Sequence, residues 1–313
     1  MPIQKVIHIK YSSMHLSFSD KLLSVRDFVL DNEALKLIPS GDHDKARVNA
    51  EAIEAVDFEY LVQGKKYNGF YARLKSLSKD ERHPVIILNR GGSALFSTID
   101  ARHIFSGFAT TVIQAGYIVI GSQCMGFAPD GAKDEMGGED FASVLALKEF
   151  IDADNRADAN RIGLYGASRG GITTFRLLAE TDWAKAAVVI SGLMTLMDDA
   201  FRSKMKGHYE KMFGGSEEER RKRSVLSWTE KLPKRVPILL MNGTSDWRVD
   251  PRTALHLSEK FLDLKIPHRL VLFEGDDHRL TKHLSESRSI AISWLDRFVR
   301  NGEGVPDMEP NGE

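Results

Sequence analysis

The sequence contains very little cysteine, because Cys124 is the only one among its 313 residues. A single thiol cannot form an internal disulfide, so no disulfide framework holds this chain together. An excess of charge of one sign is also missing: 43 Lys and Arg residues stand against 44 Asp and Glu residues, and the formal net charge is −1. Such a balance offers no global field to nucleic acid or to an anionic membrane. We therefore expect neither as a partner.

Long apolar runs and metal-ligand spacings are absent too. No window approaches the roughly 18 consecutive apolar residues that span a bilayer, and the first residues lack the apolar stretch of a signal peptide. This predicts a cytoplasmic protein that does not enter membranes. Neither His-x-x-x-His nor Cys-x-x-Cys occurs, and we interpret Cys124 as a small buried apolar residue. We expect no metal and no cofactor.

Short apolar runs alternate with longer helical stretches from residue 84 onward. The runs lie at 84–88, 117–121, 162–165, 187–190, 237–241 and 269–273. Between them, apolar residues recur at helical spacing, as in 139–152 and 288–299. This alternation predicts an α/β fold with a mostly parallel central sheet flanked by helices. Such sheets bind ligands at the carboxyl ends of their strands, where we look for chemistry.

The chain is expected to form one main domain over residues 56–300, which opens with a hairpin. An N-terminal extension over 1–55 has an uncertain structure, with a strand-like stretch at 5–10, and the acidic tail 301–313 is predicted to be disordered. The polar insertion 193–235 is predicted to form a small helical cap. Its charge run 217–223 pairs acids with bases four residues apart, which favours a solvated helix over a nucleic-acid site. The insertion also carries methionines that suit either core filling or an adaptable acyl pocket: Met194, Met197, Met205 and Met212.

The strongest chemical motif is Gly166-Ala167-Ser168-Arg169-Gly170-Gly171, between a predicted strand and a predicted helix. A serine at such a sharp turn projects its hydroxyl clear of the backbone, and the small glycines relieve the crowding of the turn. A glycine-rich turn that caps a helix or cradles phosphate is the alternative. The strand-before, helix-after context favours Ser168 as a nucleophile.

A serine nucleophile needs a base, and the base needs an orienting carboxylate. Asp246 and Asp250 both follow the strand at 237–241. Asp250 precedes a proline at a predicted helix start and reads as a helix cap, so Asp246 is the better acid. His278 follows the last strand in a glycine-containing loop, with His283 as the fallback. The chain order Ser168, Asp246, His278 is the order of an α/β-hydrolase triad.

The tetrahedral intermediate also needs hydrogen-bond donors for its oxyanion. The loop Asn89-Arg90-Gly91-Gly92-Ser93 follows the buried run at 84–88 and offers free backbone amides. We predict one donor from the Arg169 amide and the other from an amide near Gly91 or Gly92. An ordinary glycine turn is the alternative for this loop.

Together these residues resemble a known family. Residues 56–300 look like an α/β-hydrolase, and the stretches 165–171, 242–246 and 277–278 are similar to the catalytic domain of the prolyl oligopeptidase family. The segment 137–140 before a helix also resembles that family. The resemblance implies a serine hydrolase with an acyl-enzyme intermediate. Two positions depart from the family: Asn89-Arg90 replaces a usual His or Tyr, and the stretch Gln123-Cys124-Met125-Gly126 stands where members often carry an arginine.

Those peptidases usually carry a propeller that gates access to the site. The roughly 55 residues before the first hairpin cannot build several blades of about 40 residues each. We therefore expect a free-standing hydrolase that cleaves an ester or other acyl bond of a small-molecule substrate. A small serine peptidase of aminoacyl or dipeptidyl type is the alternative, and a catalytically silent hydrolase-like binding protein is another.

An arginine stands beside each predicted catalytic stretch: Arg90, Arg169 and Arg248. Guanidinium groups bind carboxylates through paired hydrogen bonds. We therefore predict Arg90, Arg248 and the adjacent Trp247 as substrate-binding residues, and an anionic group near the scissile bond. Two other roles stay open, because Arg169 could pair with a neighbouring acid and Arg248 could brace Asp250 or the cap.

Overall fold

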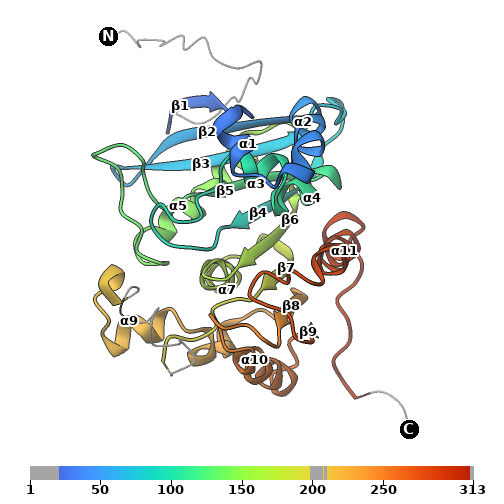
Figure 1. The fold of residues 1–313 in the computed structure, drawn as a ribbon. Coiled ribbons are helices and arrows are strands. Elements are labelled where there is room, and N and C mark those ends of the chain that lie inside the picture. Colours follow the sequence, from blue (N-terminus) through green and yellow to red (C-terminus); the bar gives the residue numbers. More distant parts are fainter. Residues whose placement is uncertain (1–20, 198–206, 208–209, 311–313) are drawn as a thin grey trace, which may run out of the picture.

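A nine-stranded sheet crosses the computed structural model, which describes residues 21–197, 207 and 210–310 (Figure 1). In this part of the chain the strand order is β1-β2-β3-β5-β4-β6-β7-β8-β9. The strands are β1 Leu22–Asp27, β2 Ile53–Val62, β3 Lys65–Leu74, β4 His83–Asn89, β5 Ile118–Ser122, β6 Ala157–Ala167, β7 Ala184–Ile190, β8 Ile238–Gly243 and β9 His268–Phe273. Strands β1, β2, β3 and β5 pair antiparallel, whereas the pairs from β5 through β9 are parallel. The predicted mostly parallel α/β sheet and its opening hairpin are confirmed.

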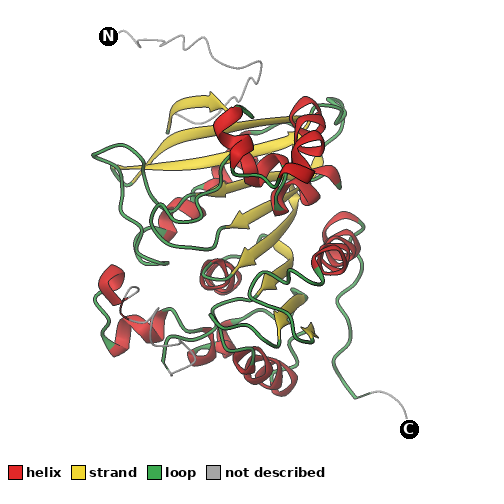
Figure 2. Cartoon of the chain, viewed as in Figure 1, coloured by secondary structure: helices red, strands yellow, loops and turns green. Residues whose placement is uncertain are grey.

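Helices cover both faces of the sheet (Figure 2). One face packs against α5 Phe141–Leu145, α6 Leu147–Ala153, α7 Gly170–Glu180 and α10 Arg252–Asp263. The other packs against α3 Ala101–Phe105, α4 Phe108–Gln114, α11 Leu284–Leu295 and the π-helical turn η4 Asp296–Arg300. Two apolar cores therefore lie on either side of one sheet, as in doubly covered parallel sheets.

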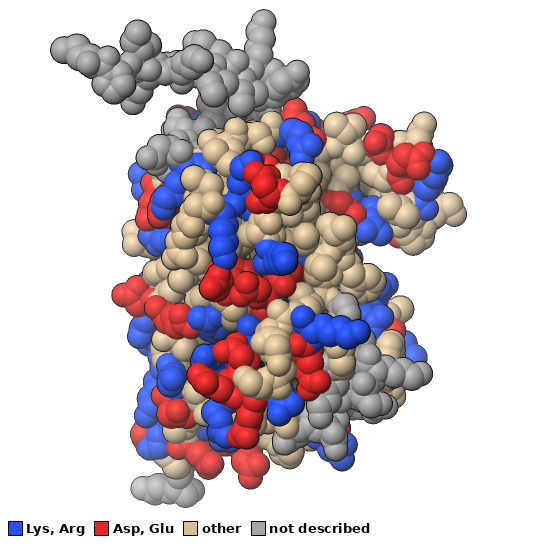
Figure 3. Space-filling view, turned by 90° about the vertical axis from the view of Figure 1, so that its left-hand side faces the viewer, with Lys and Arg blue, Asp and Glu red and all other residues tan. Residues whose placement is uncertain are grey.

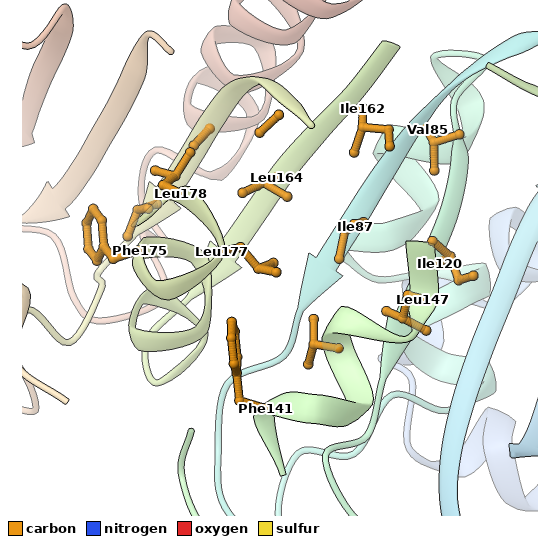
Figure 4. Close-up of a cluster of buried hydrophobic side chains, with 14 of the residues drawn as sticks. Val85, Ile87, Ile120, Phe141, Leu147, Ile162, Leu164, Phe175, Leu177 and Leu178 are labelled. Atoms are coloured by element: carbon orange, nitrogen blue, oxygen red, sulfur yellow. The ribbon is translucent and has the colours of Figure 1, made fainter. Parts of the chain in front are cut away.

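Strand β4 shows why the central strands are apolar without alternation. Val85 and Ile87 belong to the same buried cluster as Leu177 of α7 (Figure 4), and Ile86 and Leu88 belong to the opposite core. Successive side chains of a strand face opposite sides of the sheet. Because both sides are buried, every position of the strand must be apolar.

The extension before residue 56 contains structure that the sequence did not reveal. Strand β1 pairs antiparallel with β2 and extends the sheet by one strand. After it come α1 Asn32–Lys36, the 3-10 turn η1 Ser40–Asp42 and α2 His43–Ala52. Asn49 of α2 donates a hydrogen bond of 2.7 Å to the carbonyl of Phe105. The sequence left the structure of the 1–55 extension uncertain, and the structure describes residues 21–55 of it, whereas residues 1–20 lie outside the described chain.

The insertion at 193–235 is described in part. It holds α9 Glu217–Lys222 and the 3-10 turns η2 Val225–Ser227 and η3 Thr229–Lys231, whereas Met205 lies outside the described residues. The charge run forms α9, with Arg221 paired to Glu217 at 2.9 Å, as a solvated helix should be. The tail residues 301–310 form no helix or strand. Ion pairs join them to the domain, through Glu303 with Arg297 and Glu309 with Lys265, and the disorder of 301–313 stays a prediction.

Charges of both signs are interspersed over the face drawn in Figure 3, in keeping with the net charge of −1. Within the described ranges, none of the helices combines the length and apolar character that crossing a bilayer requires.

Candidate active site

Ser168 sits in a strained turn between β6 and α7. Its φ of 54° lies in the left-handed region, which non-glycine residues rarely adopt. A Cβ on Gly166 would lie 2.3 Å from Thr174 Oγ1, and one on Gly170 would lie 2.0 Å from the carbonyl oxygen of Asn89. No side chain fits at either glycine position, so the helix can cross the strand end this closely only with glycine there. This is the geometry of a nucleophile elbow.

Backbone hydrogen bonds hold this turn in place. The Ser168 N–H donates to the Ile190 carbonyl at 2.9 Å, and the Ser168 carbonyl accepts from the amides of Gly171 and Leu193, each at 2.9 Å. The turn is thereby tied to β7 and to the start of the insertion. A backbone held on both sides can keep an unfavourable φ.

Asp246 and His278 form a hydrogen-bonded pair at the carboxyl ends of β8 and β9. Asp246 Oδ2 lies 2.7 Å from His278 Nδ1, and their side chains are 0% and 9% exposed. The other carboxylate oxygen accepts from the amides of Arg248 at 2.7 Å and Val249 at 3.1 Å. A carboxylate held this way fixes the imidazole tautomer with the proton on Nδ1 and leaves Nε2 as the base.

The competing acid and base have other partners. His283 Nδ1 pairs with Asp276 at 2.9 Å rather than with Asp246. Asp250 pairs with Arg252 and accepts the Arg252 amide at 2.9 Å just before α10, whose N-cap is Pro251 rather than the predicted Asp250. The structure therefore brings together the predicted Asp246 and His278, and keeps the fallback residues apart from them.

The loop after β4 lies against the nucleophile turn. A Cβ on Gly91 would lie 3.4 Å from the Ser168 Cβ and 3.1 Å from the Ala167 carbonyl oxygen. Among the described residues, the amides of Gly91, Gly92 and Arg169 donate no intramolecular hydrogen bond. Unpartnered amides beside a nucleophile are what an oxyanion hole requires.

Two of the three arginines beside the catalytic stretches are buried. The Arg90 and Arg169 side chains are 0% and 2% exposed, and both guanidinium groups pair with Asp134. Burial lowers the pKa of Arg90 to about 10, and neighbouring Arg169 adds to the effect. Backbone carbonyls and Asp134 take the donors of Arg90, and its role in substrate binding stays a prediction. For Arg169 the alternative of a neighbouring acid holds.

Arg248 and Trp247 are placed differently from the buried arginines. Trp247 is exposed, and the Arg248 guanidinium carbon lies 4.9 Å from the centre of one of its rings. Within the described residues no carboxylate lies within ion-pair distance of Arg248, so it does not brace Asp250. This arginine stays available for the predicted role.

A small apolar cluster packs around the nucleophile helix and the insertion. Its buried members are Met136, Ile172, Leu193, Leu196 and Val249, and the partly buried Met212 and Phe213 pack against them. Met194, in contrast, belongs to the main core. The methionines of the insertion therefore divide between core filling and this cluster.

Cys124 is buried, and burial raises the pKa of its thiol to about 11, so the thiol stays neutral at physiological pH. In the part of the chain that the structure describes, no group of three or more His, Cys, Asp and Glu side chains is arranged to hold a metal ion.

Comparisons with known proteins point to one family. A model described as "Prolyl oligopeptidase family" matches residues 105–301. Dipeptidyl-peptidase 5 of Porphyromonas gingivalis is 22% identical over 237 residues, which cover 71% of this chain and 34% of that protein. YitV of Bacillus subtilis, which carries an esterase name, is 38% identical over 68 residues, or 20% of this chain and 27% of its own length.

Solved structures agree on the fold. The Pyrococcus horikoshii acylaminoacyl peptidase superposes with a TM-score of 0.67 and 20% identity, over 82% of this chain and 43% of that one. The chain spans only about a third of the length of Dipeptidyl-peptidase 5 and less than half of the acylaminoacyl peptidase chain.

Proposed function

This chain belongs to the prolyl oligopeptidase family of serine hydrolases, and we propose that it is a peptidase acting on short peptide or aminoacyl substrates. The observation that carries the hydrolytic reaction is the 2.7 Å pair of Asp246 and His278 at the sheet edge where Ser168 occupies its strained turn. The amide preference is supported by the relatives, since most of those matched carry peptidase names. They favour the peptidase alternative over the ester cleavage preferred from the sequence.

The proposed reaction proceeds through an acyl-enzyme. Ser168 Oγ attacks the carbonyl carbon of the scissile bond while His278 Nε2 takes the hydroxyl proton, and Asp246 stabilises the imidazolium. The amides of Arg169 and of Gly91 or Gly92 donate to the oxyanion of the tetrahedral intermediate. Collapse breaks the carbon–nitrogen bond, and His278 returns the proton to the leaving amine. Water then attacks the acyl ester while His278 takes a proton from it. When the second tetrahedral intermediate collapses, the ester bond to Ser168 Oγ breaks, His278 returns that proton to Ser168 Oγ, and the acid is released.

The surroundings of the site suit apolar substrate groups. Leu95 and Phe96 are exposed on the loop that carries the oxyanion amides, and Trp247 is exposed beside the triad acid. Binding sites are commonly apolar with few polar groups that orient the ligand. Arg248 is the arginine left to recognise an anionic substrate group, such as a terminal carboxylate.

Two measurements test the proposal. A fluorophosphonate probe labels only an activated serine, so the wild type should be labelled and Ser168→Ala should not. Aminoacyl and dipeptidyl p-nitroanilides, compared with p-nitrophenyl esters of the same acyl groups, then give the preferred bond. We expect anilide cleavage with kcat/KM well above that of Ser168→Ala. If the wild type is labelled but cleaves only esters, the protein is a serine esterase and not a peptidase. If the folded wild type is not labelled, the protein is not a serine hydrolase.

A further inference from the structure

One buried carboxylate, that of Asp134, contacts both chain segments that carry the candidate oxyanion amides. Asp134 lies in the loop between β5 and α5, and its side chain is buried. We propose that Asp134 is a positioning residue, which holds the Gly91–Gly92 amides and the Arg169 amide at a fixed spacing across the nucleophile. This inference rests on the proposed function, because the spacing matters only if an oxyanion forms there.

One carboxylate oxygen holds the oxyanion loop. Asp134 Oδ2 accepts from Arg90 Nη2 at 3.0 Å and from the Ala94 amide at 2.8 Å. Arg90 in turn donates to the carbonyls of Gly91 at 3.3 Å, Ala94 at 2.8 Å and Phe96 at 3.2 Å. The loop is therefore wrapped around a guanidinium that Asp134 anchors.

The same loop carries backbone strain that needs an external restraint. Ala94 has a φ of 47°, in the left-handed region that a residue with a Cβ rarely adopts, whereas Gly92 adopts its φ of 69° without strain. Such a conformation persists only when its surroundings over-determine it. The Asp134 contact to the Ala94 amide acts directly on this segment.

The other carboxylate oxygen holds the nucleophile turn. Asp134 Oδ1 accepts from a guanidinium nitrogen of Arg169 and from the Met136 amide at 3.0 Å. Arg169 directly follows Ser168 in the chain. Because Asp134 holds the Arg169 side chain, it also restrains the backbone amide of Arg169. Since each oxygen serves a different segment, the rigid carboxyl group sets the distance between them.

Asparagine at position 134 would break this arrangement while keeping its size. The amide offers one acceptor oxygen instead of two and turns an NH2 group toward a guanidinium. Removal of one oxyanion donor lowers kcat by about 10²- to 10³-fold in a serine protease. A shift of both donors without their loss should cost less, and we expect kcat to fall about 10- to 100-fold with KM within about threefold.

The test compares Asp134→Asn with Asp130→Asn in the full chain. Asp130 lies in the same loop, but its side chain is 64% exposed and pairs with Lys66 at the surface. For each protein we would measure kcat and KM with an anilide that the wild type cleaves, and Ki for a peptide boronate, which forms a tetrahedral adduct. In Asp134→Asn, Ki should rise in parallel with the loss of kcat, and Asp130→Asn should match the wild type.

If Asp134 only stabilised the fold, Asp134→Asn would lower the melting temperature without lowering kcat at a nearly unchanged KM. Asp134→Asn with kcat and Ki within threefold of the wild type would overturn the proposal. If Asp134→Asn does not fold, Arg169→Gln serves instead, because it keeps the amide of residue 169 but removes the link to Asp134. An unchanged kcat in that variant would overturn the proposal equally. A wild type that the fluorophosphonate leaves unlabelled would instead refute the proposed function.

Discussion

At the scale of single residues, the proposed acid of the triad is Asp246, because its carboxylate contacts His278. We expect Asp246→Asn to lower kcat by about 10⁴-fold, because the amide no longer enforces the tautomer with the proton on Nδ1. Asp250→Asn should stay within about threefold of the wild type, since the asparagine side chain can also accept the Arg252 amide. Kinetics of both variants on one substrate measure this. A larger loss in Asp250→Asn would reassign the acid.

A second prediction concerns Asp140 and the pH dependence of the free energy of unfolding. Burial raises the pKa of Asp140 to about 6, against the opposing effect of Arg169. The native state therefore holds this proton more tightly than the unfolded chain does. The contribution of Asp140 to the free energy of unfolding is fully present below its unfolded pKa of 3.8. This contribution is lost as the pH rises through the native pKa of about 6.

Asp140→Asn removes this titration. Relative to the variant, the wild type should lose about 2 to 3 kcal/mol of unfolding free energy between pH 4 and pH 7, at about 1.4 kcal/mol per pKa unit. Denaturant unfolding of both proteins across that range measures the difference. Asp152→Asn, in an exposed pair with Lys148, is the control and should show no such trend. A difference between Asp140→Asn and the wild type that is constant with pH would contradict the prediction.

The sequence identified the residues that a motif and the chain order define, and missed those that packing defines. Ser168, Asp246 and His278 each follow a strand in a recognisable order. Asp134 has no local signature, because its partners Arg90 and Arg169 lie far along the chain and meet it only in the folded core. The sequence displayed the charge of these arginines but not the acceptors around them. The one signal in the sequence was that arginines next to buried strands need a buried carboxylate as their partner.

At the scale of elements, the strands that are buried on both faces were predictable and the edge was not. Continuous apolar runs such as 84–88 require a covered sheet, whatever the neighbours are. The order of strands in the sheet depends on pairing across long loops, which periodicity does not encode. Strand β1 was not predicted because it lies at the edge, pairs with β2 alone and is not a continuous apolar run.

A prediction about these elements concerns Arg223, the residue that follows α9. The Arg223 guanidinium donates to the Glu135 carbonyl at 2.9 Å and the Met136 carbonyl at 3.2 Å, and so ties the insertion to the loop that contains Asp134. Its side chain is 3% exposed, whereas that of Arg221 is 58% exposed. Arg223→Met should cost about 2 to 3 kcal/mol of unfolding free energy, because charged hydrogen bonds to buried acceptors are lost.

Arg221→Met is the matched control within the same charge run. It removes only a surface pair with Glu217, and we expect a cost below about 0.5 kcal/mol. Chemical denaturation of both variants measures the two costs. Equal costs would mean that the insertion is not anchored through Arg223.

At the scale of the whole molecule, residues 21–52 before the hairpin pack into the domain, whereas the tail residues 301–310 lie on its surface. Residues 21–52 contribute Leu35, Ile38 and Ala46 to buried positions, and Asn49 accepts a hydrogen bond of 2.6 Å from Gln114. Residues 301–310 contribute surface ion pairs. Composition does not separate these cases, because both segments are rich in polar residues and only the three-dimensional partners differ.

Two deletions should therefore behave differently. Removal of 21–52 exposes the edge of β2 and the apolar surface of α3, and unpaired strand edges promote aggregation. We expect that variant to lose its cooperative thermal transition and its fluorophosphonate labelling. Truncation after Asn301 removes pairs worth about 0 to 1 kcal/mol each, so the melting temperature should stay within about 3 °C of the wild type. A soluble 21–52 deletion with wild-type melting and labelling would show that the sheet from β2 to β9 is complete without its edge strand, and that the catalytic edge folds independently of the layer that covers it.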